Sequence, residues 1–204
     1  MERQSIRILA EMINDRKYTI DYLCYENQDD IKNENKDENK DENKDENKDD
    51  KDDENDEKEI IEPFCIRGRK GNDVILCFVS NEDKLNIQGI KDRISVMNRE
   101  GSTRCVIVYR SSVTSSAKKS LETLEYDFEL FSMNELQLNI TKHRLVPRHT
   151  IVTDSEKEEL DSKYKGKLPS ILQNDAVCRY YAFQKGDYVR ITRKNGAIIY
   201  RVVK

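Results

Sequence analysis

The chain has 204 residues, 37% charged and 36% hydrophobic, with a formal net charge of −4 at pH 7. This length allows one or two domains with a buried core. No apolar run approaches the roughly 20 residues of a membrane helix, and the first residues lack the apolar stretch of a secretory signal, so we expect a soluble intracellular protein.

An amphipathic helix is predicted at the start of the sequence. Ile6, Leu9, Met12 and Ile13 recur at helical spacing, which indicates a helix up to about Arg16. The alternation of apolar and polar residues in 18–25 then favours a strand.

A strongly acidic repeat follows this strand. Lys-Asp-Glu-Asn occurs three times in 36–47, and 26–59 contain 18 acidic and 7 basic side chains, a net charge of −11. Such a segment buries too little apolar surface to offset the entropy of ordering, so we predict a disordered insert at about 27–59. An acidic segment that mimics DNA or binds histones is the alternative interpretation.

Strands and helices alternate after the insert. Apolar runs at 74–79 and 104–110 are typical of buried strands, and a further strand contains Phe128 and Leu130. A helix between the first two strands is predicted by four apolar residues at helical spacing: Leu85, Ile90, Ile94 and Met97. A second helix would be capped by Thr114 or Ser115. This order implies an α/β layer domain that ends near Thr141.

Residues 142–204 differ in charge and pattern from the rest of the chain. They contain 14 basic and 7 acidic side chains, a net charge of +7 that is compatible with a polyanionic neighbour. A helix after Thr153, a short helix near Asp175 and two alternating strands predict a small α+β domain that ends in a β-hairpin. Asn195-Gly196 indicates a type I′ turn, in which both central residues have positive φ. Because so small a domain buries little surface, packing against a partner would help to stabilise it.

Two Ser/Thr-x-x-Glu patterns predict capping boxes at helix starts. They are Ser132–Glu135 and Thr153–Glu156. In such a box the hydroxyl and the glutamate each bond to a backbone N–H of the first helical turn.

Side chains suited to catalysis or metal binding are few. The five cysteines lie far apart, and the only histidines are His143 and His149, so we expect buried thiols in a reducing compartment and no metal site. Glu82-x-Lys84 with Asp73 upstream fits the pattern of a metal-dependent nuclease, but in this composition such a triplet also arises by chance. We therefore expect no catalytic residue and no cofactor, and we keep a stand-alone nuclease of restriction-endonuclease-like fold as the alternative.

The order of short motifs in the last third of the chain resembles one protein family. The motifs are His143-Arg144-Leu145-Val146-Pro147, Leu168-Pro169, Cys178-Arg179-Tyr180 and Gly186-Asp187. They resemble the fifth-largest-subunit family of eukaryotic nuclear RNA polymerases, which has a shorter archaeal counterpart. Weaker similarity in 9–18, 112–117 and 129–143 extends the resemblance over nearly the whole chain outside the insert.

The sequence departs from the family pattern at three places. Ser115 stands where the family usually has proline, Ala176 replaces a second proline, and the loop between the last strands is shortened to 194–196. The acidic repeat is not a family feature either. These departures affect the detail of two loop tips and leave the expected fold intact.

The resemblance implies a two-domain, non-catalytic subunit of a multi-subunit DNA-dependent RNA polymerase. Residues 1–141 would form a jaw domain of restriction-endonuclease-like fold, interrupted by the insert, and would lie beside downstream duplex DNA. Residues 142–204 would form an assembly domain, similar to the archaeal counterpart, that docks on the largest polymerase subunit, among other polymerase subunits.

The expected DNA-proximal residues lie at the start of one helix: Thr114, Ser115, Ser116, Lys118 and Lys119. Hydroxyls, amides and the helix dipole there favour anions, and such contacts would be independent of DNA sequence. Ordinary capping of a surface helix is the alternative.

Arginine and aromatic side chains are favoured interface anchors. The expected subunit-interface residues are His143, Pro147, Arg179, Tyr180 and Tyr181. Tyr181 and Phe183 fit the domain core equally well.

The richness in Lys, Asn, Asp and Glu fits an AT-rich genome, of either a eukaryote or a large DNA virus. The short hairpin and the repeat favour the virus. We expect a nuclear location in a cellular organism, and the host cytoplasm or the virion for a viral protein.

Overall fold

The computed structural model describes residues 2–25, 64–80 and 82–204, so the predicted disordered insert at 27–59 lies outside the described residues. The chain divides into two compact units. The first comprises Met1–Ile20, Gly68–Val74 and Phe131–Lys204, and the second comprises Asp21–Arg67 and Ile75–Leu130. No helix in the described part is long and apolar enough to cross a membrane.

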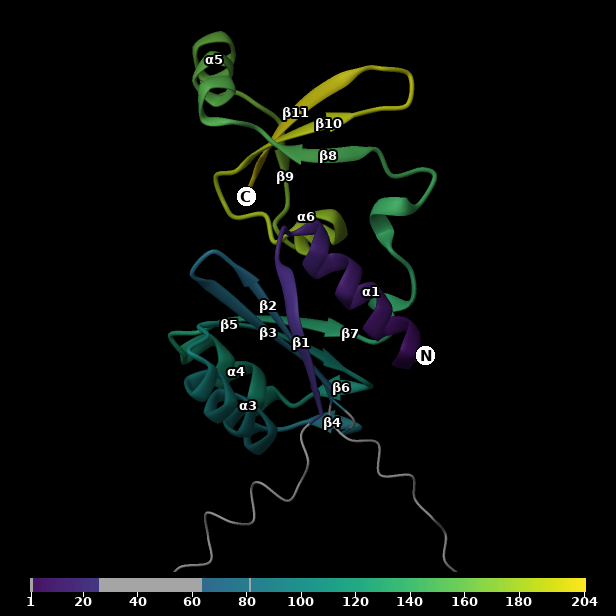
Figure 1. Cartoon of the computed structure of the whole chain (residues 1–204). Helices are drawn as coiled ribbons and strands as arrows, with labels where there is room; N and C mark the ends of the chain where they lie inside the picture. The colour runs from purple at the N-terminus through teal and green to yellow at the C-terminus, as the bar shows by residue number, and fades with distance from the viewer. Residues whose placement is uncertain (1, 26–63, 81) are drawn as a thin grey trace, which may run out of the picture. The chain divides into compact units, whose positions relative to one another are not determined.

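A five-stranded sheet of order β1-β2-β3-β5-β7 forms the framework of the second unit (Figure 1). Its strands are β1 (Thr19–Tyr25), β2 (Phe64–Lys70), β3 (Asp73–Val79), β5 (Arg104–Tyr109) and β7 (Asp127–Ser132). β3 pairs with β5 in parallel, and helix α3 (Ile87–Glu100) connects them, because parallel neighbours need a crossover. Helix α4 (Ser115–Thr123) follows the two-residue strands β4 (Lys84–Leu85) and β6 (Ser112–Val113), which pair in parallel.

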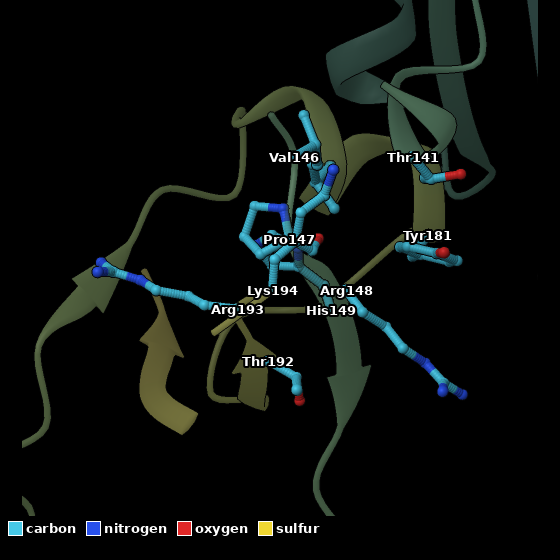
Figure 2. Close-up of a pocket in the computed structure, with 10 residues that line it drawn as sticks. Thr141, Val146, Pro147, Arg148, His149, Tyr181, Thr192, Arg193 and Lys194 are labelled. Carbon is cyan, nitrogen blue, oxygen red and sulfur yellow. Dashed lines mark hydrogen bonds between the residues drawn. The ribbon is translucent and has the colours of Figure 1, made fainter. Parts of the chain in front are cut away.

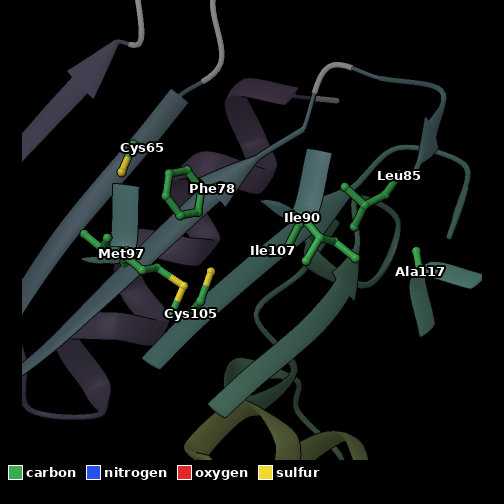
Figure 3. Packing of buried hydrophobic residues seen from close by; sticks show 9 residues of the cluster. Cys65, Phe78, Leu85, Ile90, Met97, Cys105, Ile107 and Ala117 are labelled. Atoms are coloured by element: carbon green, nitrogen blue, oxygen red, sulfur yellow. The ribbon is translucent and has the colours of Figure 1, made fainter. Parts of the chain in front are cut away.

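The core of the second unit lies between this sheet and helices α3 and α4. Phe78 from β3, Ile107 from β5 and Met97 from α3 are each at most 1% exposed and belong to one cluster of nine buried side chains (Figure 3). Cys65, Cys77 and Cys105 are also buried, and burial raises the pKa of the Cys105 thiol well above its ordinary value. For these three cysteines the expectation of buried thiols is confirmed.

The first unit contains a four-stranded sheet of order β8-β10-β11-β9 and three α-helices. The strands are β8 (Arg148–Ile151), β9 (Ser170–Ile171), β10 (Tyr188–Thr192) and β11 (Ile198–Val203). The helices are α1 (Glu2–Asp15), α5 (Asp154–Tyr164) and α6 (Ala176–Tyr181), with the 3₁₀ turns η1 (Glu135–Gln137) and η2 (Ile140–Lys142) before β8. Helix α1 packs against η1 and α6 (Figure 1).

The expectation of a mixed α/β chain is confirmed. The predicted helices and strands are present, and the open choice of cap at α4 is resolved, because the side chain of Thr114 accepts a hydrogen bond from the Ala117 amide at 3.2 Å. One detail was wrong: Leu85 lies in strand β4, and α3 begins at Ile87 after the side-chain cap of Asn86. Strands β2, β4, β6, β8 and β9 were not predicted.

The type I′ turn predicted at Asn195-Gly196 is wrong. Only Gly196 has a positive φ, of 82°, and Asn195 does not. The backbone of Arg193 pairs with Ala197, and the Gly196 amide bonds to the Arg193 carbonyl. The loop therefore has three residues, 194–196, with the glycine in the left-handed region at its end, a common alternative for hairpins.

Of the two capping boxes, one forms and the other does not. The amide of Ser132 donates to the Glu135 carboxylate at 2.7 Å, and the amide of Glu135 donates to the Ser132 hydroxyl at 3.3 Å. Thr153 occupies the N-cap of α5 but makes no side-chain cap bond. Glu156 instead accepts hydrogen bonds from Arg190 and Tyr200 on the neighbouring strands, so this prediction is corrected.

Candidate functional site

The C-terminal end of helix α6 is held by a side chain that follows helix α1. Arg16 is buried and donates one hydrogen bond to the carbonyl of Tyr180 and one to the carbonyl of Arg179, each at 2.8 Å. The helix ends at Ala182, which has a φ of 56° in the left-handed region. Because the last carbonyls of a helix carry partial negative charge, the guanidinium of Arg16 stabilises this end electrostatically and through hydrogen bonds.

A buried hydrogen-bond network lies next to this cap. The hydroxyl of Tyr180 donates to Asp15 and accepts from the Asn139 amide, at 2.8 and 2.9 Å. The same amide donates to Glu11, which also forms an ion pair with Lys142. Burial, together with the bond to Asp15, raises the pKa of the Tyr180 hydroxyl, which therefore stays protonated.

This network holds the hydroxyl of Tyr180 within the chain. The residue is 3% exposed and also lines the second pocket described below, so its expected interface role stays a prediction. Phe183 is buried in the core of the first unit. Tyr181 stacks on Phe183 with 5.3 Å between ring centroids, and its own side chain is half-buried.

A pocket of about 380 Å³ lies within the first unit, between the segment before β8 and the end of β10. It is lined by Thr141, Val146, Pro147, Arg148, His149, Val177, Tyr181, Thr192, Arg193 and Lys194 (Figure 2). His149 is buried, with its Nδ1 2.8 Å from the Pro147 carbonyl, and this contact fixes the bend before β8. Two predicted interface residues, Pro147 and Tyr181, thus line one pocket, whereas His143 is exposed outside its lining.

Arg179, another predicted interface residue, lies at a second, more apolar pocket of about 310 Å³. Its guanidinium stacks over Phe131, 4.4 Å from the ring centroid, and forms an ion pair with Glu135. Partial burial opposes ionisation of Glu135, but the hydrogen bonds from Ser132 and Arg179 outweigh it and lower the pKa of this carboxyl. Leu138, 74% exposed, also lines the pocket.

The predicted DNA-proximal residues lie together at the start of α4 in the second unit. Ser115, Ser116, Lys118 and Lys119 are exposed. The Thr114 hydroxyl caps the helix and lies 3.3 Å from the Ser116 hydroxyl, so both side chains already have partners within the helix. Lys118 and Lys119 are therefore the side chains of this set that offer positive charge to solvent.

The carboxylates that the nuclease alternative would use as metal ligands lie in surroundings that do not suit this role. Asp73 accepts a 2.5 Å hydrogen bond from the Tyr18 hydroxyl, and Glu82 and Asp83 lie in an exposed bend before β4. Within the described ranges, no three His, Cys, Asp or Glu side chains are grouped as metal ligands would be. Nothing in this geometry favours nuclease chemistry.

Sequence reasoning gave no role to Glu11, Asp15, Arg16 or Asn139. Their function depends on contacts between positions more than 120 residues apart, such as the 164-residue separation of Arg16 and Tyr180. Asn139 does carry one sequence signal, since it is a polar residue between the apolar Leu138 and Ile140.

Similarity to known proteins covers both units. The family model described as "RNA polymerase Rpb5, C-terminal domain" matches residues 138–203. The subunit rpabc1 of DNA-directed RNA polymerases I, II and III from Dictyostelium discoideum is 34% identical over 67% of this chain and 73% of its own length. The corresponding subunit from Caenorhabditis briggsae is 37% identical over 64% of this chain and 66% of its own length.

A viral relative is also similar. A protein of Invertebrate iridescent virus 6, named as a putative subunit of a DNA-directed RNA polymerase, is 34% identical over 49% of this chain and 61% of its own length. These matches define the class of protein, a subunit of a DNA-directed RNA polymerase. The chain belongs to the Rpb5 family of RNA polymerase subunits.

Proposed function

We propose that this protein is a non-catalytic subunit of a multi-subunit DNA-dependent RNA polymerase and docks on the largest subunit through its first compact unit. The observation that carries the proposal is the family match over 138–203, which lies within the compact unit that contains both pockets. Leu138 and Leu145, 74% and 75% exposed, add apolar surface of the kind that protein partners cover.

The finer parts of the proposal rest on the family resemblance. The second unit, with its mixed sheet and helices α3 and α4, corresponds to a jaw domain of restriction-endonuclease-like fold. Residues 1–141 and 142–204 remain the proposed jaw and assembly domains. The compact first unit nevertheless includes helix α1, so the docking surface depends on residues from both ends of the chain.

Co-purification tests the proposal. The full chain, tagged and expressed in its native cell or infected host, is expected to elute in a multi-subunit complex that contains the largest polymerase subunit. The full chain is preferable to residues 142–204 alone, because the fragment would lack Arg16 and Asp15 of the α6 network. Elution as a free protein of about 24 kDa under gentle lysis would contradict the proposal.

The proposed DNA contact has its own experiment. Lys118→Glu with Lys119→Glu is expected to shorten the lifetime of elongation complexes several-fold at low salt, because sequence-independent phosphate contacts depend on positive charge. Lys91→Glu with Arg99→Glu, two exposed basic residues of helix α3 in the second unit, is the matched control. Equal lifetimes for both pairs across a salt series would remove the DNA-proximal assignment.

The compartment in which the protein acts depends on whether its source is a cell or a virus. The relatives include subunits of polymerases I, II and III and a viral protein, and we propose the nucleus for a cellular protein and the host cytoplasm or the virion for a viral one. Immunolocalisation distinguishes these locations.

A further inference from the structure

The pocket of the first unit that Pro147 and Tyr181 line has charged side chains of one sign only. Its lining includes Arg148, Arg193 and Lys194, all exposed, and contains no acidic residue. Figure 2 shows Arg148 and Arg193 extending from the pocket in opposite directions, so positive charge lies on both sides of it. A ligand that enters this pocket meets a positive potential from either side.

Part of the pocket lining is apolar. Val146, Pro147 and Val177 contribute hydrocarbon surface, and the ring of Tyr181 adds an aromatic wall, beside the polar side chains of Thr141 and Thr192. Hydrocarbon walls in a concave site favour a side chain that is buried on binding. The site thus combines apolar surface with exposed basic side chains.

Strand β8 begins at the pocket and lies at one end of the four-stranded sheet. The Val152 amide bonds to the Tyr188 carbonyl on β10, and antiparallel alternation then directs the backbone groups of His149 and Ile151 to the outer edge. Ile151 is 55% exposed. An edge of this kind is a template for an added strand.

We propose that this pocket and the outer edge of β8 bind an extended acidic segment of a partner protein. An apolar side chain of the segment fills the pocket, carboxylates on either side of it pair with Arg148, Arg193 and Lys194, and its main chain pairs with β8. This inference deepens the proposed docking function and rests on it. A nucleic acid fits less well, because it offers no side chain for the apolar part of the lining and no peptide groups for the strand edge.

A fluorescence anisotropy titration of the full chain tests the inference. The probe is a fluorescein-labelled nonapeptide in which valine alternates with glutamate. The wild-type chain is expected to bind it saturably, whereas the same peptide with lysine in place of glutamate does not bind. Methylation of alternate peptide nitrogens, which removes main-chain donors, is expected to weaken binding about tenfold. Absence of saturable binding by the unmodified peptide overturns the inference.

Charge-reversal variants locate the binding site. Arg193→Glu with Lys194→Glu is expected to weaken binding about tenfold or more, because the loop charges border the pocket. Lys167→Glu with Lys185→Glu changes the net charge equally at exposed positions outside the pocket and is expected to bind as wild type does. Circular dichroism checks that both variants are folded. Equal binding by the two variants overturns the assignment to this pocket.

Two alternative ligands of the pocket, a nucleic acid and the chain's own acidic segment, are tested separately. A single-stranded oligonucleotide that displaces the peptide at lower concentration would make nucleic acid the ligand and overturn the inference. A chain without 29–57 is expected to bind the peptide with unchanged affinity, and tighter binding would make the chain's own acidic segment the occupant and overturn the assignment to a partner protein. Co-purification of the wild-type chain with the polymerase is scored independently, so failure of peptide binding alone leaves the docking function standing.

Discussion

The two compact units differ in where their exposed large apolar side chains lie. Both units bury a core: a cluster of nine residues lies between the sheet and two helices of the second unit, and the first unit buries residues of helix α1, such as Leu9 and Met12, as well as a cluster of five on its sheet. The large hydrophobic side chains that stay exposed in the described part of the chain all belong to the first unit: Leu138, Leu145, Ile151, Tyr164, Leu172 and Ile198. The first unit therefore presents exposed apolar surface of the kind that protein partners cover.

Truncation of Phe78 is expected to have the largest effect and tests the closed core of the second unit. Phe78→Ala removes a ring that is 1% exposed and should lower the free energy of unfolding by about 3–5 kcal/mol. Leu138→Ala, at an exposed position of the first unit, should change it by less than about 0.5 kcal/mol. Urea denaturation of both variants measures the difference, and equal losses would contradict the contrast between the units.

Loss of Arg16 should have the next largest effect, because its guanidinium holds the end of helix α6 through hydrogen bonds to two backbone carbonyls. Arg16→Ala removes two charge-assisted hydrogen bonds to the end of α6 and is expected to cost about 2–3 kcal/mol. Arg3→Ala, on the exposed side of helix α1, is the control. Comparable midpoints for the two variants in chemical denaturation would show that the cap contributes little.

Removal of the hydroxyl from Tyr180 and from Tyr181 gives a matched pair of variants, one at a buried tyrosine and one at a partly exposed tyrosine. Tyr180→Phe should destabilise the protein by about 1–2 kcal/mol, because it removes the hydroxyl that donates to Asp15 and accepts from the Asn139 amide. Tyr181→Phe should change stability by less than about 0.5 kcal/mol. Thermal unfolding of both variants checks this prediction, and a larger effect at Tyr181 would reverse the roles assigned to the two rings.

Lowering the pH should reduce the stability of the first unit slightly, because Glu11 becomes protonated. The hydrogen bond from Asn139, followed by that from Lys142, lowers the pKa of this carboxyl from its ordinary value of 4.5. Its contribution to stability is therefore complete above pH 4.5 and is lost as the pH falls through the lower native pKa. Glu11→Gln should flatten the stability profile between about pH 5 and pH 3. An unchanged slope would show that the carboxylate does not couple to folding.

The sequence predicted the elements whose signal is local. The spacing of Leu9, Met12 and Ile13 predicted α1, and the apolar run ending at Val79 predicted β3. Strands β8 and β9 were missed because they have four and two residues, too few for a periodic pattern, and exist only through pairing with β10 and β11.

Predictions from short sequence patterns failed where a residue distant in sequence binds the side-chain group on which the pattern depends. Thr153-x-x-Glu156 has the pattern of a capping box, but Arg190 and Tyr200 take the Glu156 carboxylate. No sequence pattern indicated that Asp15 and Asn139 hold the hydroxyl of Tyr180 inside the unit. Both outcomes depend on tertiary contacts between positions at least 34 residues apart, which no local window contains.

The bond between Arg16 and Tyr180 has a consequence for biosynthesis. The two residues are separated by 164 positions, so the ribosome makes α1 long before the helix that Arg16 caps. At about 5–20 residues per second the delay is roughly 10–30 s. During this interval the apolar face of α1, with Leu9, Met12 and Ile13, lacks its final neighbours. The nascent chain therefore passes through a stage at which a chaperone can bind this face.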